Sequence, residues 1–237
     1  MNKKLGIIGG MGPLASAYLY KRIIELTNAL KDQDHIPIII DNKTEILDRT
    51  AFLTGKGKDP YPFIKESAIF LENSNVDAII IACNTAHFCY EKLKKDVSIP
   101  IYHMIEEVVE EIKENPNLQE GLAILGTEGL RLFPSYKEKL NQAGIFCYET
   151  NLEEQNKVSE IIYLVKEEGV TKKVLEKFKS LINSLEKKNL KHFILGCTEL
   201  PLIVENLDLN KKYISSIDVL AKRTIKKLGY PLKGEKE

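Results

Sequence analysis

VDAIIIACNTAHFC, from Val76 to Cys89, is an apolar run that passes into small polar residues without any glycine or proline. Residues Ala78–Ala82 are apolar and mostly β-branched, which is typical of a parallel strand buried on both faces. The next five residues, CNTAH, suit the loop at a strand's carboxyl end and the first turn of a helix. Open α/β sheets bind their ligands at that edge. Cys83 is therefore either an inert small side chain or a nucleophile or base.

Composition limits the classes of protein to consider. The chain has 237 residues, 43% of them hydrophobic, with 34 basic and 34 acidic side chains. This balance gives no electrostatic signal for nucleic acid or an anionic membrane, and the length suffices for one large or two small domains. No apolar run approaches the ~20 residues of a membrane-spanning helix. We expect neither nucleic-acid nor membrane partners.

The cysteines and the N-terminus indicate a compartment. The first strand begins by Leu5, which leaves no room for a signal peptide. Four cysteines at irregular spacing in so long a chain do not resemble a disulfide framework. We therefore expect a cytoplasmic protein whose thiols are reduced.

Strands and helices alternate along the chain. The order β-α-β-α-β-α-β-α in the first half is typical of an α/β fold with a largely parallel sheet. The second half restarts the pattern at residue 121. The expected strands are 4–9, 35–40, 78–82, 99–103, 121–126, 145–148 and 191–195. The expected helices begin at Pro13 and then span 63–71, 83–95, 104–113, 132–143, 153–168 and 170–187.

Three segments of the first half have counterparts in the second at nearly one spacing. Residues 6–9 match 123–126, residues 80–85 match 194–198, and residues 101–110 match 213–222. This repetition predicts a duplicated α/β unit. Because Cys83 and Cys197 end equivalent strands, we expect them to face each other across the cleft between the halves.

Two facing thiols allow several interpretations. Free cysteine is often buried and inert, and a disulfide is unusual in a cytoplasmic protein. A metal site at Cys83, His87 and Cys89 has an uncommon zinc spacing and no second-half ligands. Acyl transfer by one cysteine gives the other no role. Two-base proton transfer uses both, because one thiolate removes a proton from one face of a carbon and the opposite thiol returns one to the other face.

That chemistry requires thiols of lowered pKa and a grip on the substrate. A thiol of pKa about 8.5 is only slightly ionised at neutral pH, whereas a helix N-terminus lowers the value to roughly 3.5–7.5. We expect both cysteines at such positions. The same N–H groups, with the hydroxyls of Thr85 and Thr198 and the amide of Asn84, are suited to a substrate carboxylate.

Other features leave alternatives. Residues 10–15, GMGPLA, fit the dinucleotide motif G-x-G-x-x-A. However, Pro13 lacks an N–H, and no acidic residue ends the second strand at the usual distance, so a turn that brings Met11 to the substrate is favoured. By sequence alone, Arg49 and Lys166 fit surface charges, and His87 fits a capping or packing role. No lysine has the context of a pyridoxal-phosphate site.

The motifs GGMGP at 9–13, CNTAH at 83–87 and GCTE at 196–199 together resemble those of the aspartate/glutamate racemase family. The resemblance spans nearly the whole chain. It implies a cofactor-independent amino-acid racemase that often forms homodimers, with two pseudo-symmetric α/β domains and the active site between them. We divide the chain into a first domain, 1–102 with 216–237, and a second domain, 103–215.

The resemblance also assigns roles to residues. The paired catalytic cysteines of the family match Cys83 and Cys197. Its arginine in a D-R-T motif and its second-half lysine, which handle the side-chain carboxylate in aspartate racemases, match Arg49 and Lys166. The expected substrate-binding residues are Met11, Arg49, Asn84, Thr85, Ala86, Lys166 and Thr198.

One stretch departs from the family pattern. Related chains tend to carry a threonine and then a serine after the first strand of the second domain, where this chain has Leu130 and Phe133. Substrate preference can therefore differ from plain aspartate. We expect racemisation of an acidic amino acid, with aspartate favoured and without metal or other cofactor. The alternatives are racemisation or isomerisation of glutamate or another small carboxylate, or a non-catalytic ligand-binding protein.

Overall fold

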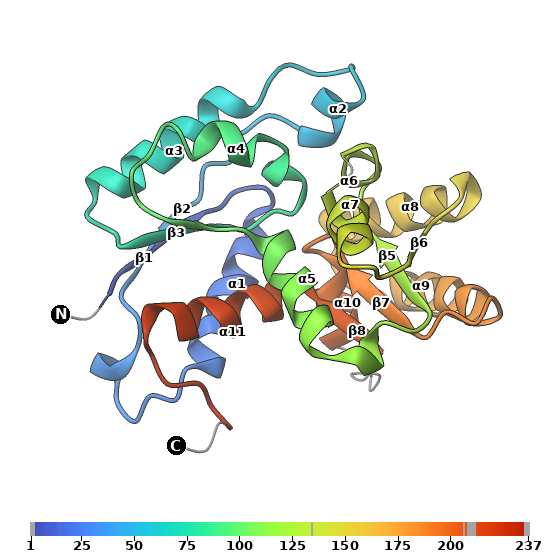
Figure 1. Cartoon of the computed structure of the whole chain (residues 1–237). Helices are drawn as coiled ribbons and strands as arrows, with labels where there is room; N and C mark the ends of the chain where they lie inside the picture. Colours follow the sequence, from blue (N-terminus) through green and yellow to red (C-terminus); the bar gives the residue numbers. More distant parts are fainter. Residues whose placement is uncertain (1–2, 134, 206, 208–211, 235–237) are drawn as a thin grey trace.

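Two four-stranded parallel sheets form the framework of the computed structural model, which describes residues 3–133, 135–205, 207 and 212–234 (Figure 1). Their strand orders, β2-β1-β3-β4 and β6-β5-β7-β8, are the same when the second half is counted from its own first strand. The predicted duplicated α/β fold is therefore confirmed. The strands are β1 Leu5–Ile8, β2 Ile38–Asp41, β3 Ala78–Ile81, β4 Ile101–Tyr102, β5 Leu122–Leu125, β6 Cys147–Glu149, β7 His192–Leu195 and β8 Tyr213–Ser215.

Helices flank both sheets, as expected of parallel strands joined by crossovers. The α-helices are α1 Pro13–Leu26, α2 Arg49–Leu53, α3 Tyr61–Asn73, α4 Tyr90–Leu93, α5 Met104–Glu114, α6 Glu128–Leu132, α7 Ser135–Gln142, α8 Leu152–Glu168, α9 Lys172–Glu186, α10 Leu200–Glu205 and α11 Ser216–Leu228. Short 3-10 helices are η1 Asp32–Asp34, η2 Thr85–Cys89 and η3 Pro116–Leu118. No helix of the described chain is both long and apolar enough to cross a membrane.

Equivalent strands bring the two cysteines to equivalent places. β3 pairs with β1 up to Ile81 opposite Ile8, and β7 pairs with β5 up to Leu195 opposite Leu125. All four residues of β1 and of β3 are buried, because helices cover both faces of the sheet. Each cysteine lies two residues beyond the end of its strand, which is where the sequence predicted it.

The main differences from the sequence prediction concern three elements. β2 starts at Ile38 instead of residue 35, because Pro37 has no N–H to give to a sheet. The helix expected at 83–95 is two short pieces, η2 and α4. The helix expected at 132–143 is divided into α6 and α7; Phe133 has an extended backbone, since the residue before a proline disfavours the helical region.

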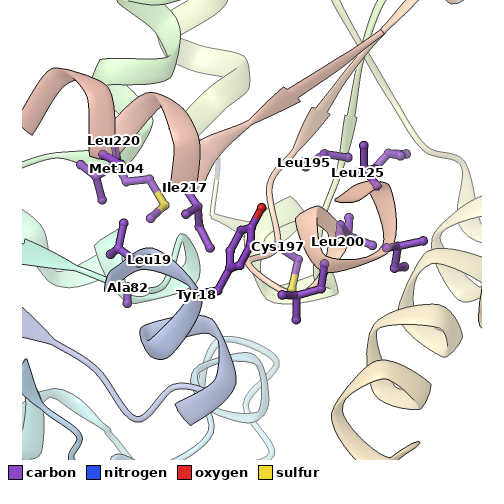
Figure 2. Packing of buried hydrophobic residues seen from close by; sticks show 14 of the residues in the cluster. Tyr18, Leu19, Ala82, Met104, Leu125, Leu195, Cys197, Leu200, Ile217 and Leu220 are labelled. Atoms are coloured by element: carbon purple, nitrogen blue, oxygen red, sulfur yellow. The ribbon is translucent and has the colours of Figure 1, made fainter. Parts of the chain in front are cut away.

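One of the hydrophobic clusters contains buried residues of both halves. Helix α11 packs against both α1 and α5, so the end of the chain returns to the first half. Figure 2 shows Ala82 and Met104 on one side of Tyr18, and Leu195 and Leu200 on the other, within a single buried cluster. The predicted domain boundaries stay a prediction. Residues 1–2, 134, 206, 208–211 and 235–237 lie outside the described chain.

Candidate active site

A cavity of about 130 Å³ lies between the two halves and contains both predicted thiols. It is far smaller than the roughly 300–1,000 Å³ of a pocket for a drug-sized ligand, so it suits a small metabolite. Its walls come from the strand ends of both sheets and from α2, α6 and α8. The lining residues are Met11, Asp48, Arg49, Thr50, Cys83, Asn84, Thr85, Thr127, Glu128, Asn156, Ser159, Ile162, Tyr163, Lys166, Gly196, Cys197, Thr198 and Glu199.

The expected residues gather there with one exception. Ala86 does not line the cavity and is fully buried in the turn behind it. The hydroxyls of Thr85 and Thr127 lie 3.0 Å apart and join the two halves across the cavity. Helix α2 of the first half contacts α6 of the second half (Figure 1). The Cα of Thr50 lies so close to Gly129 that an added Cβ on Gly129 would be 2.9 Å from it.

The thiol of Cys197 has a carboxylate partner that the sequence prediction did not include. Its Sγ donates a 2.8 Å hydrogen bond to Oε2 of Glu199, and both side chains are buried. Burial raises the pKa of Cys197 well above its usual value, and the adjacent Glu199 carboxylate raises it further. The expected lowering of this pKa is therefore wrong. Helix α10 begins only at Leu200, and the effect of burial and of the Glu199 carboxylate outweighs that of the helix N-terminus.

Lys166 lines the cavity, and a third of its side chain is also exposed to solvent. Its charged neighbours had favoured a wholly solvated position. Its Nζ lies 3.5 Å from Oε1 of Glu199. Burial lowers the pKa of Lys166, but the Glu199 carboxylate and the two thiols outweigh that effect, so the net shift is upward. Lys166 is therefore a stable cation beside Cys197.

Arg49 reaches the cavity from the N-terminus of α2. Its guanidinium donates hydrogen bonds to the carbonyls of Met11 at 3.0 Å and Leu47 at 3.1 Å, and a longer one of 3.4 Å to Ile46. Its Nε is buried without a hydrogen-bond partner in the protein. Arg49 thus holds the Met11 turn at the cavity wall and keeps one donor unused.

The glycine turn before α1 is closed to a phosphate. Gly10 has φ of +86°, and a Cβ there would lie 2.5 Å from the main chain of Lys43. The main chain therefore fills the space beside this glycine. Since the adjoining cavity also suits only a small molecule, the dinucleotide alternative loses its support.

His87 and His103 are buried behind the Cys83 turn and serve structural roles. His87 Nδ1 bonds the Cys83 carbonyl at 2.9 Å, and its Nε2 accepts the N–H of Met104. His103 caps α5, because its Nδ1 accepts the N–H groups of Ile105 and Glu106. Burial lowers the pKa of His87 to about 4 and that of His103 to about 2, so both rings are neutral.

The other interpretations of this stretch find no support. All four cysteines are free and buried. Cys89 donates to the Ala86 carbonyl, and burial raises its pKa to about 12, as suits an inert thiol. Within the described residues, no group of three or more His, Cys, Asp or Glu side chains is arranged to hold a metal ion.

The buried histidines predict a pH-dependent stability. Below pH 6.5 the unfolded chain protonates both rings while the folded chain does not, so each ring lowers the free energy of unfolding by up to about 1.4 kcal/mol per pH unit. Above pH 6.5 both states are neutral and the effect vanishes. His103→Asn keeps a capping side chain and should remove about half of this slope between pH 6.5 and 4. Urea unfolding across that range measures it, and an unchanged slope would contradict the assignment.

Leu130 and Phe133 line a separate small cavity. The Leu130 side chain packs over Gly126 and Gly196, where an added Cβ would lie 2.6 and 2.7 Å from it. The hydroxyl-bearing residues that the second half contributes to the wall of the thiol cavity are Thr127, Ser159, Tyr163 and Thr198. The departure from the family pattern therefore lies outside the wall of the thiol cavity, and the expected difference in substrate preference stays a prediction.

Several cavity residues were not predicted from the sequence. Asn156, Ser159 and Tyr163 line the cavity together with Lys166, at successive spacings of three, four and three residues along α8. Such spacing places side chains on one face of a helix, so it was a usable signal. Glu199 also had a usable signal in the sequence, because it is a charged residue that interrupts an apolar stretch two residues after Cys197.

Comparisons with known proteins agree with this geometry. A sequence model described as Asp/Glu/Hydantoin racemase matches residues 8–224. The structure of Picrophilus torridus aspartate racemase superposes with a TM-score of 0.87 at 30% identity, covering 98% of this chain and 96% of that one. The broad specificity amino-acid racemase RacX of Bacillus subtilis is 26% identical over 93% of this chain and 96% of its own. Glutamate racemase of Aquifex pyrophilus is 31% identical, over 65% of this chain and 58% of its own. The chain belongs to the Asp/Glu/Hydantoin racemase family, and it is an amino-acid racemase that works without pyridoxal phosphate.

Proposed function

We propose that the enzyme interconverts L- and D-aspartate by two-base proton transfer at Cα between Cys83 and Cys197. The observation that carries this proposal is that both thiols, from equivalent strand ends of the two halves, line one small cavity. A substrate carbon between them would present one face to each thiol, which is the arrangement that inversion requires.

In the proposed reaction each proton has a defined donor and acceptor. The Cys83 thiolate takes the Cα proton, and the Cys197 thiol gives its proton to the opposite face. Cys83 then ends as the thiol and Cys197 as the thiolate. Support for Cys197 as the initial acid is its raised pKa and its hydrogen bond to Glu199. In the reverse direction, the Cys197 thiolate takes the Cα proton, and the resulting thiol donates its hydrogen bond to the Glu199 carboxylate.

Both substrate carboxylates have candidate partners among the residues of the cavity wall. We propose that the turn at Asn84–Ala86 holds the α-carboxylate with its N–H groups, helped by the hydroxyls of Thr85 and Thr198. Arg49 and Lys166 are the cations for the side-chain carboxylate. Arg49 already bonds main-chain carbonyls, and Lys166 already pairs with Glu199. If these bonds persist when substrate binds, neither cation selects an acidic side chain. The second candidate function is therefore a racemase of broader amino-acid specificity, like RacX.

Deuterium incorporation tests the function directly. The purified enzyme, without added cofactor, is incubated in D₂O with each of the common amino acids in turn. We expect inversion of aspartate with deuterium at Cα of the product, measured by NMR and chiral chromatography. Faster exchange of glutamate or of uncharged amino acids than of aspartate would overturn the substrate assignment. Inversion without solvent deuterium in the product would overturn proton abstraction.

Arg49→Ala tests the side-chain grip. If the guanidinium binds the side-chain carboxylate, kcat/KM for aspartate should fall about tenfold to hundredfold more than kcat/KM for alanine, since a hydrogen bond to a charged group is worth about 1.5–3 kcal/mol. The comparison of two substrates cancels any general effect of releasing the Met11 carbonyl. Equal losses for aspartate and alanine would remove this role from Arg49.

We further propose a homodimer in the cytoplasm. Leu14 and Tyr20 on α1 are 57% and 41% exposed, and Ile24 lies on the same helix, an apolar exposure that suits a subunit contact. Free thiols at all four cysteines suit a reducing compartment. Sedimentation at micromolar concentration tests the dimer, and a monomer there would contradict it.

A further inference from the structure

A chain of buried hydrogen bonds connects the turn after β3 to strand β7. The hydroxyl of Tyr136, on α7, lies 2.7 Å from Oδ1 of Asn84. Nδ2 of Asn84 lies 2.9 Å from the hydroxyl of Ser216, at the start of α11, and this hydroxyl lies 2.8 Å from the carbonyl of Leu195. Asn84 and Tyr136 are each 2% exposed and Ser216 is fully buried. Elements of both halves therefore meet on one amide group.

The direction of every bond in this chain is fixed by its last member. The Leu195 carbonyl accepts only, so the single hydroxyl proton of Ser216 goes to it. Ser216 must then accept from Asn84, which places the NH₂ end of the amide toward Ser216 and Oδ1 toward Tyr136. Tyr136 donates to Oδ1, and burial raises the pKa of Tyr136, so its hydroxyl keeps the proton.

This direction matters because Asn84 lines the cavity next to Cys83. The NH₂ group has two protons, and Ser216 takes one of them. The second would donate to a substrate carboxylate that lies in the cavity. If the amide rotated by half a turn, an oxygen would take its place and repel that carboxylate. The chain also ends on β7, two residues before Cys197, so it links the two strand ends that carry the thiols.

We propose, on the basis of the two-thiol reaction above, that Tyr136 and Ser216 are positioning residues of the racemase. They act through Asn84: they fix its amide with the NH₂ end toward the α-carboxylate and hold the Cys83 turn at a set distance from the Cys197 strand. Their contribution should be common to all amino-acid substrates, because every substrate has the α-carboxylate. This distinguishes them from Arg49, whose proposed partner is the side chain.

The chain offers matched controls for both residues. The hydroxyls of Tyr213 and Ser67 are buried in the described structure without a hydrogen-bond partner. Tyr213→Phe therefore removes a buried phenol hydroxyl as Tyr136→Phe does, but breaks no bond. Ser67→Ala, on α3, is the equivalent control for Ser216→Ala.

The experiment measures kcat, KM and the melting temperature of these four variants on the amino acid that the wild-type enzyme racemises fastest and on a second one with a different side chain. We expect Tyr136→Phe and Ser216→Ala to lower kcat/KM about tenfold to hundredfold, by the same factor for both substrates and with a raised KM. Tyr213→Phe and Ser67→Ala should stay within about twofold of wild type. The inference is overturned if Tyr136→Phe has the kcat/KM of the wild-type enzyme, or if kcat/KM falls as much in the control variants. It is also overturned if Tyr136→Phe and Ser216→Ala have an unchanged KM and a lower kcat that is explained entirely by a smaller fraction of folded enzyme. Failure of the two-thiol reaction shows separately, as retained activity in the cysteine variants.

Discussion

Cys83→Ser and Cys197→Ser should each lower racemisation of aspartate by at least about 1,000-fold. Each variant removes one of the two proposed acid–base groups, and a positioned acid or base contributes about 10²–10⁴-fold to a rate. A serine hydroxyl is also a far weaker acid than a thiol, so it can neither form the base nor donate as readily. The initial rates of inversion from L- and from D-aspartate, followed by circular dichroism, measure the loss in both directions.

The chain provides a control for these cysteine variants. Cys89 is buried six residues after Cys83 and donates to the Ala86 carbonyl, but it does not line the cavity. Cys89→Ser should keep the activity within a few-fold of wild type. Retained inversion in either Cys83→Ser or Cys197→Ser would rule out the two-base mechanism, whatever amino acid the enzyme prefers.

Glu199→Gln is expected to have the next largest effect, a fall in kcat of about a hundredfold. The variant keeps the shape of the side chain but removes the charge that accepts the Cys197 hydrogen bond. The Glu199 carboxylate raises the pKa of Cys197, so its removal should lower that pKa. Cys197 would then lose its proton at a lower pH, and the alkaline limb of the pH–rate profile should move to lower pH.

The matched control is Glu205→Gln on α10. Glu205 forms a surface ion pair with Lys21 at 2.6 Å and does not line the thiol cavity. This variant should leave both kcat and the alkaline limb unchanged. An alkaline limb that stays in place in Glu199→Gln would show that the carboxylate does not control the Cys197 proton.

The extent of sequence prediction can be judged from particular elements. The buried strands β1, β3, β5 and β7 were predicted because a short continuous apolar run is typical of a parallel strand that is buried on both faces. The ends of elements were predicted less well. The helix expected after Cys83 is short because η2 turns the chain tightly, and the hydrogen bonds that allow this turn include those of His87 with the Cys83 and Asn84 carbonyls.

The candidate site was likewise predicted only in part. The two thiols and the cationic residues were identified from motifs, and these residues line the cavity. Asn156 and Tyr163 were not identified, although they share a face of α8 with Lys166. Glu199 was read as part of a motif without a role of its own. The role of such residues depends on which side chains lie across the cleft, and those neighbours are distant in the sequence.

The sequence by itself determined the alternation of strands and helices, the duplication, and the place of one cysteine at the end of an equivalent strand in each half. These follow from local patterns of apolar and polar residues. Only the tertiary structure decided that the Glu199 carboxylate lies 2.8 Å from the Cys197 thiol and that the pKa of Cys197 is raised. It also decided that the Asn84 amide forms hydrogen bonds with both Tyr136 and Ser216. The reason is physical: pKa values and hydrogen-bond partners depend on burial and on neighbours in space, which chain order does not specify.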